Sequence, residues 1–217
     1  MAFDPVLEDL PAILPIFPLS GVLLLPRGPL PLNIFEPRYL AMTSDVLAQP
    51  QRLIGMVQPE SGQESRAMPS VYRIGCAGRI TQFQETDDGR YLITLTGVCR
   101  FRVLEEMAGV KGYRRVKADW TDFAHDLEEE EGGFDRDRLI APLKAYFKAQ
   151  KIEANWDAIR DTPDDRLVNS LSMVCPFTPA EKQALLVAPD LPRRAEVLTT
   201  LLEMAVVETG ADGAGPQ

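Results

Sequence analysis

The spacing of apolar residues changes character near the middle of the chain. In residues 11–121 the apolar residues occur in short β-type runs, whereas in residues 135–208 they recur at helical spacing. The first pattern is typical of strands and the second of amphipathic helices. The sequence therefore predicts a β-rich first region and a helical second region.

The clearest strand signal is a pair of runs on either side of a turn. Residues 79–84 and 91–96 are both β-type, and apolar residues alternate in the second run. The intervening Asp87-Asp88-Gly89 is typical of a hairpin turn, because glycine readily adopts positive φ. Gly97 follows the second run and predicts a bulge or a bend.

Prolines punctuate the chain before this hairpin. Residues 13–19 are apolar and contain two prolines, which cannot donate to a ladder, so we expect this strand at a sheet edge or beside a bulge. Pro37 favours the first turn of a helix, which should end near Pro50. With about six strands and one helix, residues 11–121 are predicted to form a small, closed or nearly closed β-barrel.

Helix starts are marked in the second region. Thr162-Pro163 and Thr178-Pro179 each place threonine at an N-cap, and Glu181 completes a capping box with Thr178. Apolar stripes predict helices that bury one side. The stripes are Leu139, Leu143, Tyr146 and Phe147; Leu167, Leu171 and Val174; and Leu198, Leu201, Leu202 and Ala205. The predicted fold class is thus α+β, a barrel followed by an all-helical subdomain at 135–208.

The two regions are separated by an acidic stretch that ends in glycines. Residues 122–134 include four consecutive glutamates and two glycines. Like charges repel one another and glycine resists ordering, so we expect an exposed connector. Residues 209–217 are mostly small and are expected to form a disordered tail.

Composition narrows the classes of partner. The net charge of −9 opposes a surface built to hold phosphate backbones. No apolar run reaches the ~20 residues that cross a bilayer, and the first residues lack a secretory signal. Three scattered cysteines are a poor disulfide framework and are expected to be buried. These features predict a reduced, cytoplasmic protein that binds no membrane.

Motifs for a cofactor or a metal are absent from the sequence. It contains neither a phosphate-binding Gly-x-x-x-x-Gly-Lys-Ser/Thr loop nor a Gly-x-Gly-x-x-Gly turn. The single histidine, His125, lies near Asp122 and Asp126, but no cysteine pair has zinc-site spacing. A lone histidine in a polar connector is typically solvated. We therefore expect no cofactor and no metal.

Hydrolase chemistry has little local support. No Gly-x-Ser-x-Gly elbow is present, and Ser20, Ser70 and Ser172 carry no local signature. A serine–lysine pair would bring together distant residues, so an uncharacterised hydrolase stays an alternative hypothesis. The favoured expectation is a protein that is not an enzyme.

One corner offers a surface for binding. Residues 30–39 place Phe35, Arg38 and Tyr39 at a strand-to-helix junction between prolines. In one interpretation the two aromatics and the guanidinium form a rigid ledge for a peptide. In the other, the aromatics fill the core, and Glu36 and Arg38 satisfy backbone groups or each other.

These residues also carry a resemblance to a known family. The order of Leu14-Pro15-Ile16-Phe17-Pro18-Leu19, the 30–39 segment, Ile74–Ile80, Tyr91–Gly97 and Arg100–Val103 resembles the Lon protease N-terminal (substrate-binding) domain family. The helical segment Glu181-Lys182-Gln183-Ala184-Leu185-Leu186 is also similar. The match covers most of the chain.

The resemblance implies a PUA-like β pseudo-barrel followed by a helical subdomain. It also implies a stand-alone member without ATPase or protease modules, which recognises other proteins without degrading them. The implied partners are unfolded or exposed polypeptide segments, and protease components are further candidates. Because PUA-like barrels elsewhere hold RNA, an RNA-binding module is an alternative hypothesis, although the net charge makes nucleic acid an unfavoured partner. Its candidate basic face comprises Arg100, Arg102, Arg114, Arg115 and Lys117.

Overall fold

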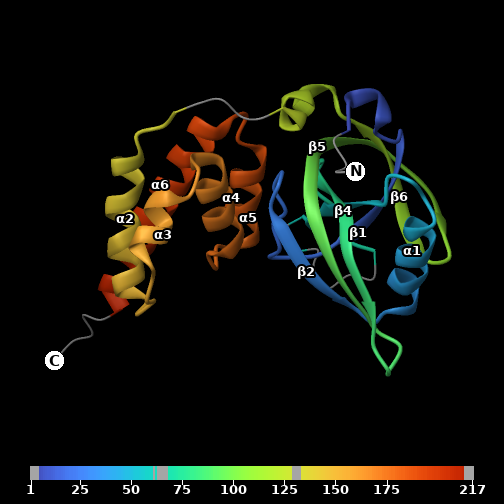
Figure 1. The fold of residues 1–217 in the computed structure, drawn as a ribbon, viewed down its shortest axis with the longest axis horizontal. Helices are drawn as coiled ribbons and strands as arrows, with labels where there is room; N and C mark the ends of the chain where they lie inside the picture. Colours follow the sequence, from blue (N-terminus) through green and yellow to red (C-terminus); the bar gives the residue numbers. More distant parts are fainter. Residues whose placement is uncertain (1–4, 61, 63–67, 129–132, 213–217) are drawn as a thin grey trace. The chain divides into compact units, whose positions relative to one another are not determined.

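The computed structural model describes residues 5–60, 62, 68–128 and 133–212. The chain divides into two compact units, Met1–Glu129 and Glu130–Gln217. The first holds all the strands of the described chain and the second only helices (Figure 1).

The first unit is built on a six-stranded mixed sheet that closes on itself. The strands are β1 (Ile13–Pro18), β2 (Pro29–Ile34), β3 (Leu53–Val57), β4 (Ile74–Glu85), β5 (Tyr91–Val110) and β6 (Tyr113–Asp119). Their order is β2-β5-β4-β3-β1-β6, and β5 also pairs with β6. That additional pairing joins β5, β4, β3, β1 and β6 into a ring, which leaves no free strand edge within the closed part. The predicted pseudo-barrel is confirmed.

Closure depends on the length and the bulge of β5. Residues 91–96 pair with β2 on one side and with β4 on the other, whereas residues 102–110 pair with β6. The register with β4 shifts beside Gly97, which confirms the predicted bulge. A Cβ at Gly97 would lie 2.0 Å from the carbonyl oxygen of Leu25. Glycine is therefore required where the two chain segments cross.

Strand β1 corrects one expectation. It does not lie at an edge, because β3 pairs with it in parallel and β6 pairs with it antiparallel, and neither register contains the shift that a bulge would produce. The two ladders are staggered along β1: Pro15 lies within the β6 register and Pro18 within the β3 register. Each proline thus meets only one neighbouring ladder, which allows an interior position despite the missing N–H groups.

The barrel interior is apolar and is covered by one helix. Helix α1 (Pro37–Leu47) begins with a proline in its first turn, as predicted, and buries Tyr39, Met42 and Val46 against the strands. Short 3₁₀ helices precede β1 (η1, Leu7–Asp9) and follow β6 (η2, Thr121–Leu127).

The second 3₁₀ helix corrects the expected start of the connector. Residues 122–127 belong to η2 and not to an exposed linker, and Phe123 and Asp126 are buried. Asp126 is buried because it pairs with Arg100 of β5, which removes it from the acidic run that follows. Glu128 is the last described residue before 133, so most of the acidic run lies outside the described residues.

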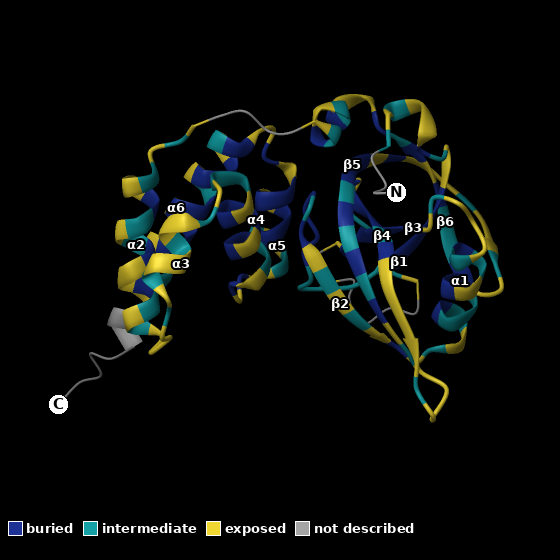
Figure 2. Ribbon diagram, viewed as in Figure 1, coloured by how far each residue is buried: buried dark blue, intermediate teal, exposed yellow. Residues whose placement is uncertain are grey.

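The second unit contains five helices in its described part. They are α2 (Arg136–Ala149), α3 (Trp156–Asp161), α4 (Asp164–Val174), α5 (Pro179–Val187) and α6 (Leu191–Asp212). Leucines of the predicted stripes are buried, among them Leu139, Leu143 and Leu198. In contrast, Val174 is 81% exposed. Figure 2 shows this one-sided burial on the helices.

One of the two predicted threonine N-caps is present and the other is not. The capping box of Thr178 and Glu181 is present at the start of α5. Thr162 instead ends α3, where its hydroxyl donates to the carbonyl of Ala158, and α4 begins after Pro163 without a side-chain cap. Helix α6 continues to Asp212, beyond the predicted end at 208, and the rest of the predicted tail lies outside the described residues.

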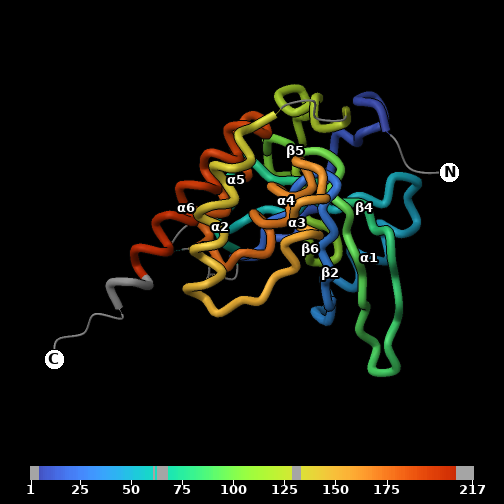
Figure 3. The backbone as a smooth tube through the Cα atoms, turned by 60° about the vertical axis from the view of Figure 1, so that its left-hand side comes forward, coloured from blue at the N-terminus to red at the C-terminus, as the bar shows by residue number. Residues whose placement is uncertain are grey.

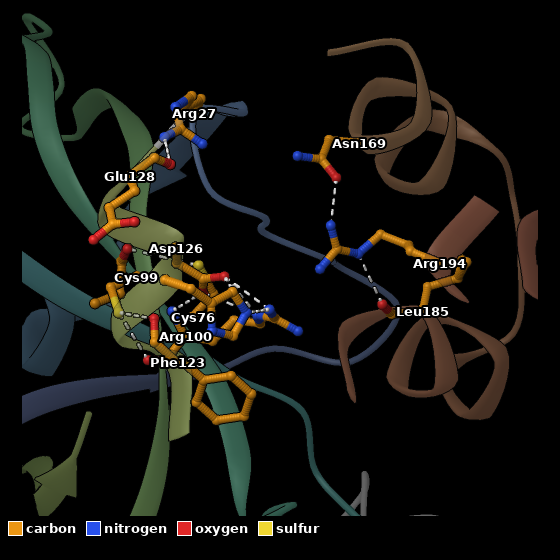
Figure 4. A network of polar contacts seen from close by, with 12 residues as sticks. Arg27, Cys76, Cys99, Arg100, Phe123, Asp126, Glu128, Asn169, Leu185 and Arg194 are labelled. Carbon is orange, nitrogen blue, oxygen red and sulfur yellow. Dashed lines mark hydrogen bonds and ion pairs between the residues drawn. The ribbon is translucent and has the colours of Figure 1, made fainter. Parts of the chain in front are cut away.

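A buried arginine joins three helices of this unit. Arg194 of α6 is fully buried and donates to the carbonyl of Leu185 at 3.2 Å and to the side-chain oxygen of Asn169 at 3.0 Å (Figure 4). Such contacts satisfy a charge that would be costly to bury alone. The helical unit therefore has a polar clamp within its apolar core.

Candidate functional site

One part of the barrel unit lies outside the closed ring. We call it the wing and define it as residues 29–35, 81–85 and 91–96. It comprises β2, the end of β4 and the start of β5, with β5 in the middle. Figure 3 shows the β4–β5 hairpin extending beyond the other strands of its unit. All five residues 81–85 are exposed, which is unusual for consecutive positions in a strand (Figure 2).

The turn at the tip of the wing matches the sequence prediction. Gly89 has φ +78°, and its N–H donates to the carbonyl of Thr86 at 2.9 Å. Arg90 forms an ion pair with Asp88 at 2.9 Å. The Thr86 hydroxyl donates to the carboxylate of Asp88, which lowers the pKa of that carboxyl. The tip is thus held by its own polar groups.

The wing exposes large apolar side chains. Phe35 is 62% exposed, Phe83 44% and Leu92 41%. The register places Asn33 and Leu92 opposite each other, so their side chains share one face of the sheet. Phe83 lies opposite Ile93 on the other face. Apolar surface is therefore offered on both sides of the strands.

A shallow groove runs across the three strands of the wing. It has a volume of about 460 Å³ and is lined by residues 31–33, 82–84 and 92–94. All nine lining residues are uncharged and include the amides Asn33, Gln82 and Gln84. A groove of this composition suits an extended apolar segment, because it offers hydrogen-bonding groups without fixed charge.

The three predicted site residues have different environments. Phe35 is exposed, and the guanidinium of Arg90 lies 6.0 Å from the centre of its ring. Arg38 is half-buried and pairs with Glu36 at 2.8 Å. Tyr39 is buried, with its ring centroid 4.1 Å from that of Phe17. Phe35 therefore fits a contact surface.

Arg38 and Tyr39 fit the structural interpretation of the corner. The guanidinium of Arg38 lies 4.6 Å above the Tyr39 ring, and burial raises the pKa of Tyr39. Because Tyr39 packs into the core, it cannot offer the exposed apolar contact expected of a ledge. Its buried ring instead stabilises the corner through core packing. The structure brings Phe35 together with wing residues that the sequence interpretation missed.

Phe83 and Leu92 are those missed residues. Phe83 is the only aromatic residue in the polar run 79–84, which is a weak signal that the sequence did offer. Leu92 lies between the inward-facing residues of β5 and is indistinguishable by type from core leucines. Both side chains are exposed because they lie at the open end of the sheet, which becomes apparent only in the folded structure.

A buried polar cluster around Arg100 in the barrel is held together by its own contacts. The Arg100 guanidinium donates to Asp126 at 2.7 and 2.9 Å, and the Arg100 backbone N–H donates to the same carboxylate at 2.8 Å. Its guanidinium carbon lies 4.6 Å above the Phe123 ring (Figure 4). His125 Nε2 lies 3.1 Å from Arg100 Nη2. The Asp126 carboxylate, which follows His125 in the sequence, is thus held by an arginine.

The candidate RNA-binding residues do not form a free cationic face. Arg100 is buried. Arg102 and Arg114 each pair with a carboxylate at 2.7 Å, and Arg115 donates to a backbone carbonyl at 2.9 Å. Of the five, Lys117 alone is exposed and forms no hydrogen bond or ion pair through its side chain within the described residues. Neutralised arginines gain little from phosphate, which favours the structural interpretation.

Candidate nucleophiles also have structural environments. Ser172 is buried, and its hydroxyl donates to the carbonyl of Val168 at 2.7 Å. All three cysteines are free and buried, as expected. Burial raises the pKa of Cys99 and raises that of Cys175 to about 11. Activation of a thiol needs the opposite shift.

The described residues contain neither a metal-binding cluster nor a membrane-spanning helix. Within the described ranges, no three histidine, cysteine or acidic side chains gather as a group that could hold a metal ion. No helix in the part of the chain that the structure describes is long and apolar enough to span a membrane.

The sequence and the fold both match known proteins. Residues 13–204 match the family described as the ATP-dependent protease La (LON) substrate-binding domain. Lon protease 2 of Myxococcus xanthus is 24% identical over 90% of this chain, and the Anaeromyxobacter dehalogenans Lon protease is 31% identical over 45%. This chain covers only 24% and 12% of those two relatives.

A solved structure shares the fold. The Lon N-terminal domain protein from Xanthomonas campestris has a TM-score of 0.59 and 23% identity, with 87% of this chain and 97% of that chain covered. The N-terminal domain of Mycobacterium avium complex Lon protease has a TM-score of 0.58 and 16% identity. At these identities the structures show a common fold.

Proposed function

Because the chain belongs to the family of LON substrate-binding domains, we propose that it is a non-catalytic protein that binds exposed segments of other polypeptides through its wing. The homology supports a polypeptide-binding role. In this proposal the bound segment is handed to other proteins, protease components among them, and is not cut by this chain.

The observation that carries the proposal is the exposed apolar surface of the wing. Phe35 and Leu92 are exposed on the face of the wing that carries most of the residues lining the uncharged groove, and Phe83 is exposed on the opposite face. Fully burying one such side chain contributes about 1.5–3 kcal/mol, so a ligand that covers Phe35 and Leu92 on one face, or Phe83 on the other, gains useful affinity. The side chains stand on paired strands, so little ordering energy opposes binding.

The corner residues have separate roles in this proposal. Phe35 contacts the ligand directly. Tyr39 holds α1 against the barrel through its contact with Phe17 and so fixes the strand-to-helix corner. Arg38 is engaged by Glu36 and contributes at most a polar contact at the margin. Replacing Arg38 should therefore weaken binding less than replacing Phe35.

Titration with a permanently unfolded protein tests the proposal. Reduced, carboxymethylated α-lactalbumin carrying a fluorescent label would be titrated with the protein, and the native form of α-lactalbumin would serve as the folded competitor. We expect saturable binding of the unfolded form only. Absence of saturable binding at low and moderate salt would contradict the proposed function.

Matched variants locate the surface. Phe35→Ser and Phe83→Ser should each weaken binding by about tenfold, because an exposed aromatic anchor is worth roughly 1–2 kcal/mol. Leu104→Ser is the control, because Leu104 is 46% exposed on β5 but lies outside the wing. An equal loss for the control would show that the wing has no special role.

A further inference from the structure

The wing has two strand edges that differ in their backbone groups. One belongs to β2, which pairs only with β5. The other belongs to residues 81–85 of β4, because the β3–β4 register ends at Arg79. Within the described residues no strand pairs with either edge. A free edge presents unpaired N–H and C=O groups, which can bind another extended chain.

Prolines block the edge of β2. The N–H of Gly97 donates to the carbonyl of Gly28 at 3.0 Å, which fixes the alternation along this antiparallel pair. In an antiparallel pair every second residue directs its backbone groups toward the partner strand, and Gly28 is one of these residues. Leu30 and Leu32 therefore direct their backbone groups toward β5, whereas Pro29, Pro31 and Asn33 direct theirs outward. The two prolines have no N–H, so the outward side is poor in donors.

The edge of β4 is not blocked. At the hairpin end, the N–H of Thr86 donates to the carbonyl of Arg90 at 2.9 Å. Because the alternation continues along β4 from this pair, the backbone groups of Gln84 point toward β5. The N–H and C=O groups of Phe83 and Glu85 therefore point outward. These positions are exposed and contain no proline. The same strand also carries the exposed Phe83 ring.

We propose that an extended polypeptide binds by adding a strand to β4 at residues 81–85, and that the β2 edge takes no part. The proposal rests on the proposed function and gives it a mode of recognition. Backbone hydrogen bonds to Phe83 and Glu85 hold the ligand independently of its sequence. Its side chains alternate between the two faces and cover the Phe83 ring.

The charge of the hairpin selects the occupant. The hairpin contains Glu85, Asp87, Asp88 and Arg90, and Arg90 pairs with Asp88. Glu85 and Asp87 have no ion-pair partner among the described residues, so the edge is acidic. It therefore fits an extended segment of a non-native protein in which apolar residues alternate with basic or neutral polar ones. A second copy of this chain would bring two acidic hairpins together and is disfavoured.

Backbone variants of the protein test the mode of binding. The probe is a labelled eight-residue peptide in which valine and leucine alternate with lysine and threonine, titrated by fluorescence anisotropy. Glu85→Pro removes one outward N–H at a position where proline is tolerated. It should weaken binding about three- to tenfold relative to Glu85→Ala, its matched control. Equal affinities for the two variants would overturn strand addition. Thermal unfolding of both variants, followed by circular dichroism, verifies that each is folded.

The other edge supplies a second control. Pro31→Ala restores an outward N–H on β2 and should leave affinity for the same peptide unchanged within about twofold, which is less than one hydrogen bond contributes. A clear gain of affinity would show that β2 accepts strands and would overturn the choice of edge.

Backbone variants of the peptide complete the test. Two forms of the probe are N-methylated on alternate residues, each blocking the donors of one peptide edge. Loss of affinity in at least one form supports strand addition, whereas unchanged affinity in both overturns it and leaves side-chain recognition in the groove. If neither the parent peptide nor unfolded α-lactalbumin binds, the proposed function itself fails. A dimer through the β4 edge in sedimentation equilibrium would assign the edge to a second copy and also overturn the proposal.

Discussion

The closed part of the barrel and the wing share strands β4 and β5 but use their residues in opposite ways. In the ring, Arg100 is buried and its carboxylate partner Asp126 is held by three donors. In the wing, five consecutive residues of β4 are exposed, and large apolar side chains meet solvent. One strand pair thus buries its side chains at one end and exposes them at the other, where we propose that it contacts a ligand.

The ring therefore should not tolerate the loss of its buried ion pair. Asp126→Ala leaves the Arg100 charge buried without its main partner, and we expect a loss of about 3–5 kcal/mol in the free energy of unfolding. Urea denaturation followed by circular dichroism measures it. The double variant Arg100→Met, Asp126→Leu should be much closer to the parent protein, because it removes both charges together. A loss under about 1 kcal/mol in the single variant would show that the ring does not depend on this pair.

Substituting one phenylalanine in each region allows a direct comparison of the ring with the wing. Phe101 lies on β5 within the ring, is fully buried, and packs against Trp120 with ring centroids 5.5 Å apart. Phe101→Ala should cost about 3–5 kcal/mol of stability. Phe35→Ala should change stability by less than about 0.5 kcal/mol and yet weaken peptide binding. The same denaturation experiment measures both. A large stability loss from Phe35→Ala would make the wing part of the core and break the comparison.

Exposed ion pairs of the barrel should contribute least to the free energy of unfolding. A hydrogen bond from Arg114 lowers the pKa of Glu106, where the two side chains pair at 2.7 Å. A folded-state pKa below the unfolded value of about 4.3 means that the stabilisation is present above that pH and is lost as the pH falls through the folded pKa.

The effect should be below about 1 kcal/mol, because the Glu106 side chain is 41% exposed. Comparing the free energy of unfolding at neutral pH and at about pH 3 in the parent protein and in Glu106→Gln isolates it. An identical pH dependence of stability in both proteins would show that the Glu106–Arg114 pair does not supply this stabilisation.

Local patterns in the sequence were sufficient for much of the fold. The hairpin at Gly89, the bulge at Gly97 and the capping box at Thr178 each depend on a few adjacent residues, and each is present. The closed barrel also follows from the number of short strands, because closure removes exposed edges.

The sequence interpretation failed where distant residues decide the outcome. Asp126 was expected in an exposed connector, since its neighbours are acidic; its partner Arg100 lies on a strand that no local pattern connects to it. β1 was expected at an edge or beside a bulge because of its prolines, but staggered ladders on both sides accommodate them. For Tyr39 both a surface contact and a core position are open from the sequence, because residue type alone does not distinguish them, and its burial favours the core.

The candidate site was only partly predictable for the same reason. Phe35 stands out in a proline-rich corner, and its exposure fits the predicted contact surface. Phe83 and Leu92 join it only because β4 extends past its partner β3, which is a property of the whole sheet.

Amide hydrogen exchange at single-residue resolution tests the central claim most directly. Exchange would be followed by NMR for the free protein and for the protein saturated with the alternating peptide. The account predicts that the peptide slows exchange of the Phe83 and Glu85 N–H groups, while the exposed backbone of β2 is unchanged. Protection confined to the helical unit, or to strands of the closed ring, would contradict it.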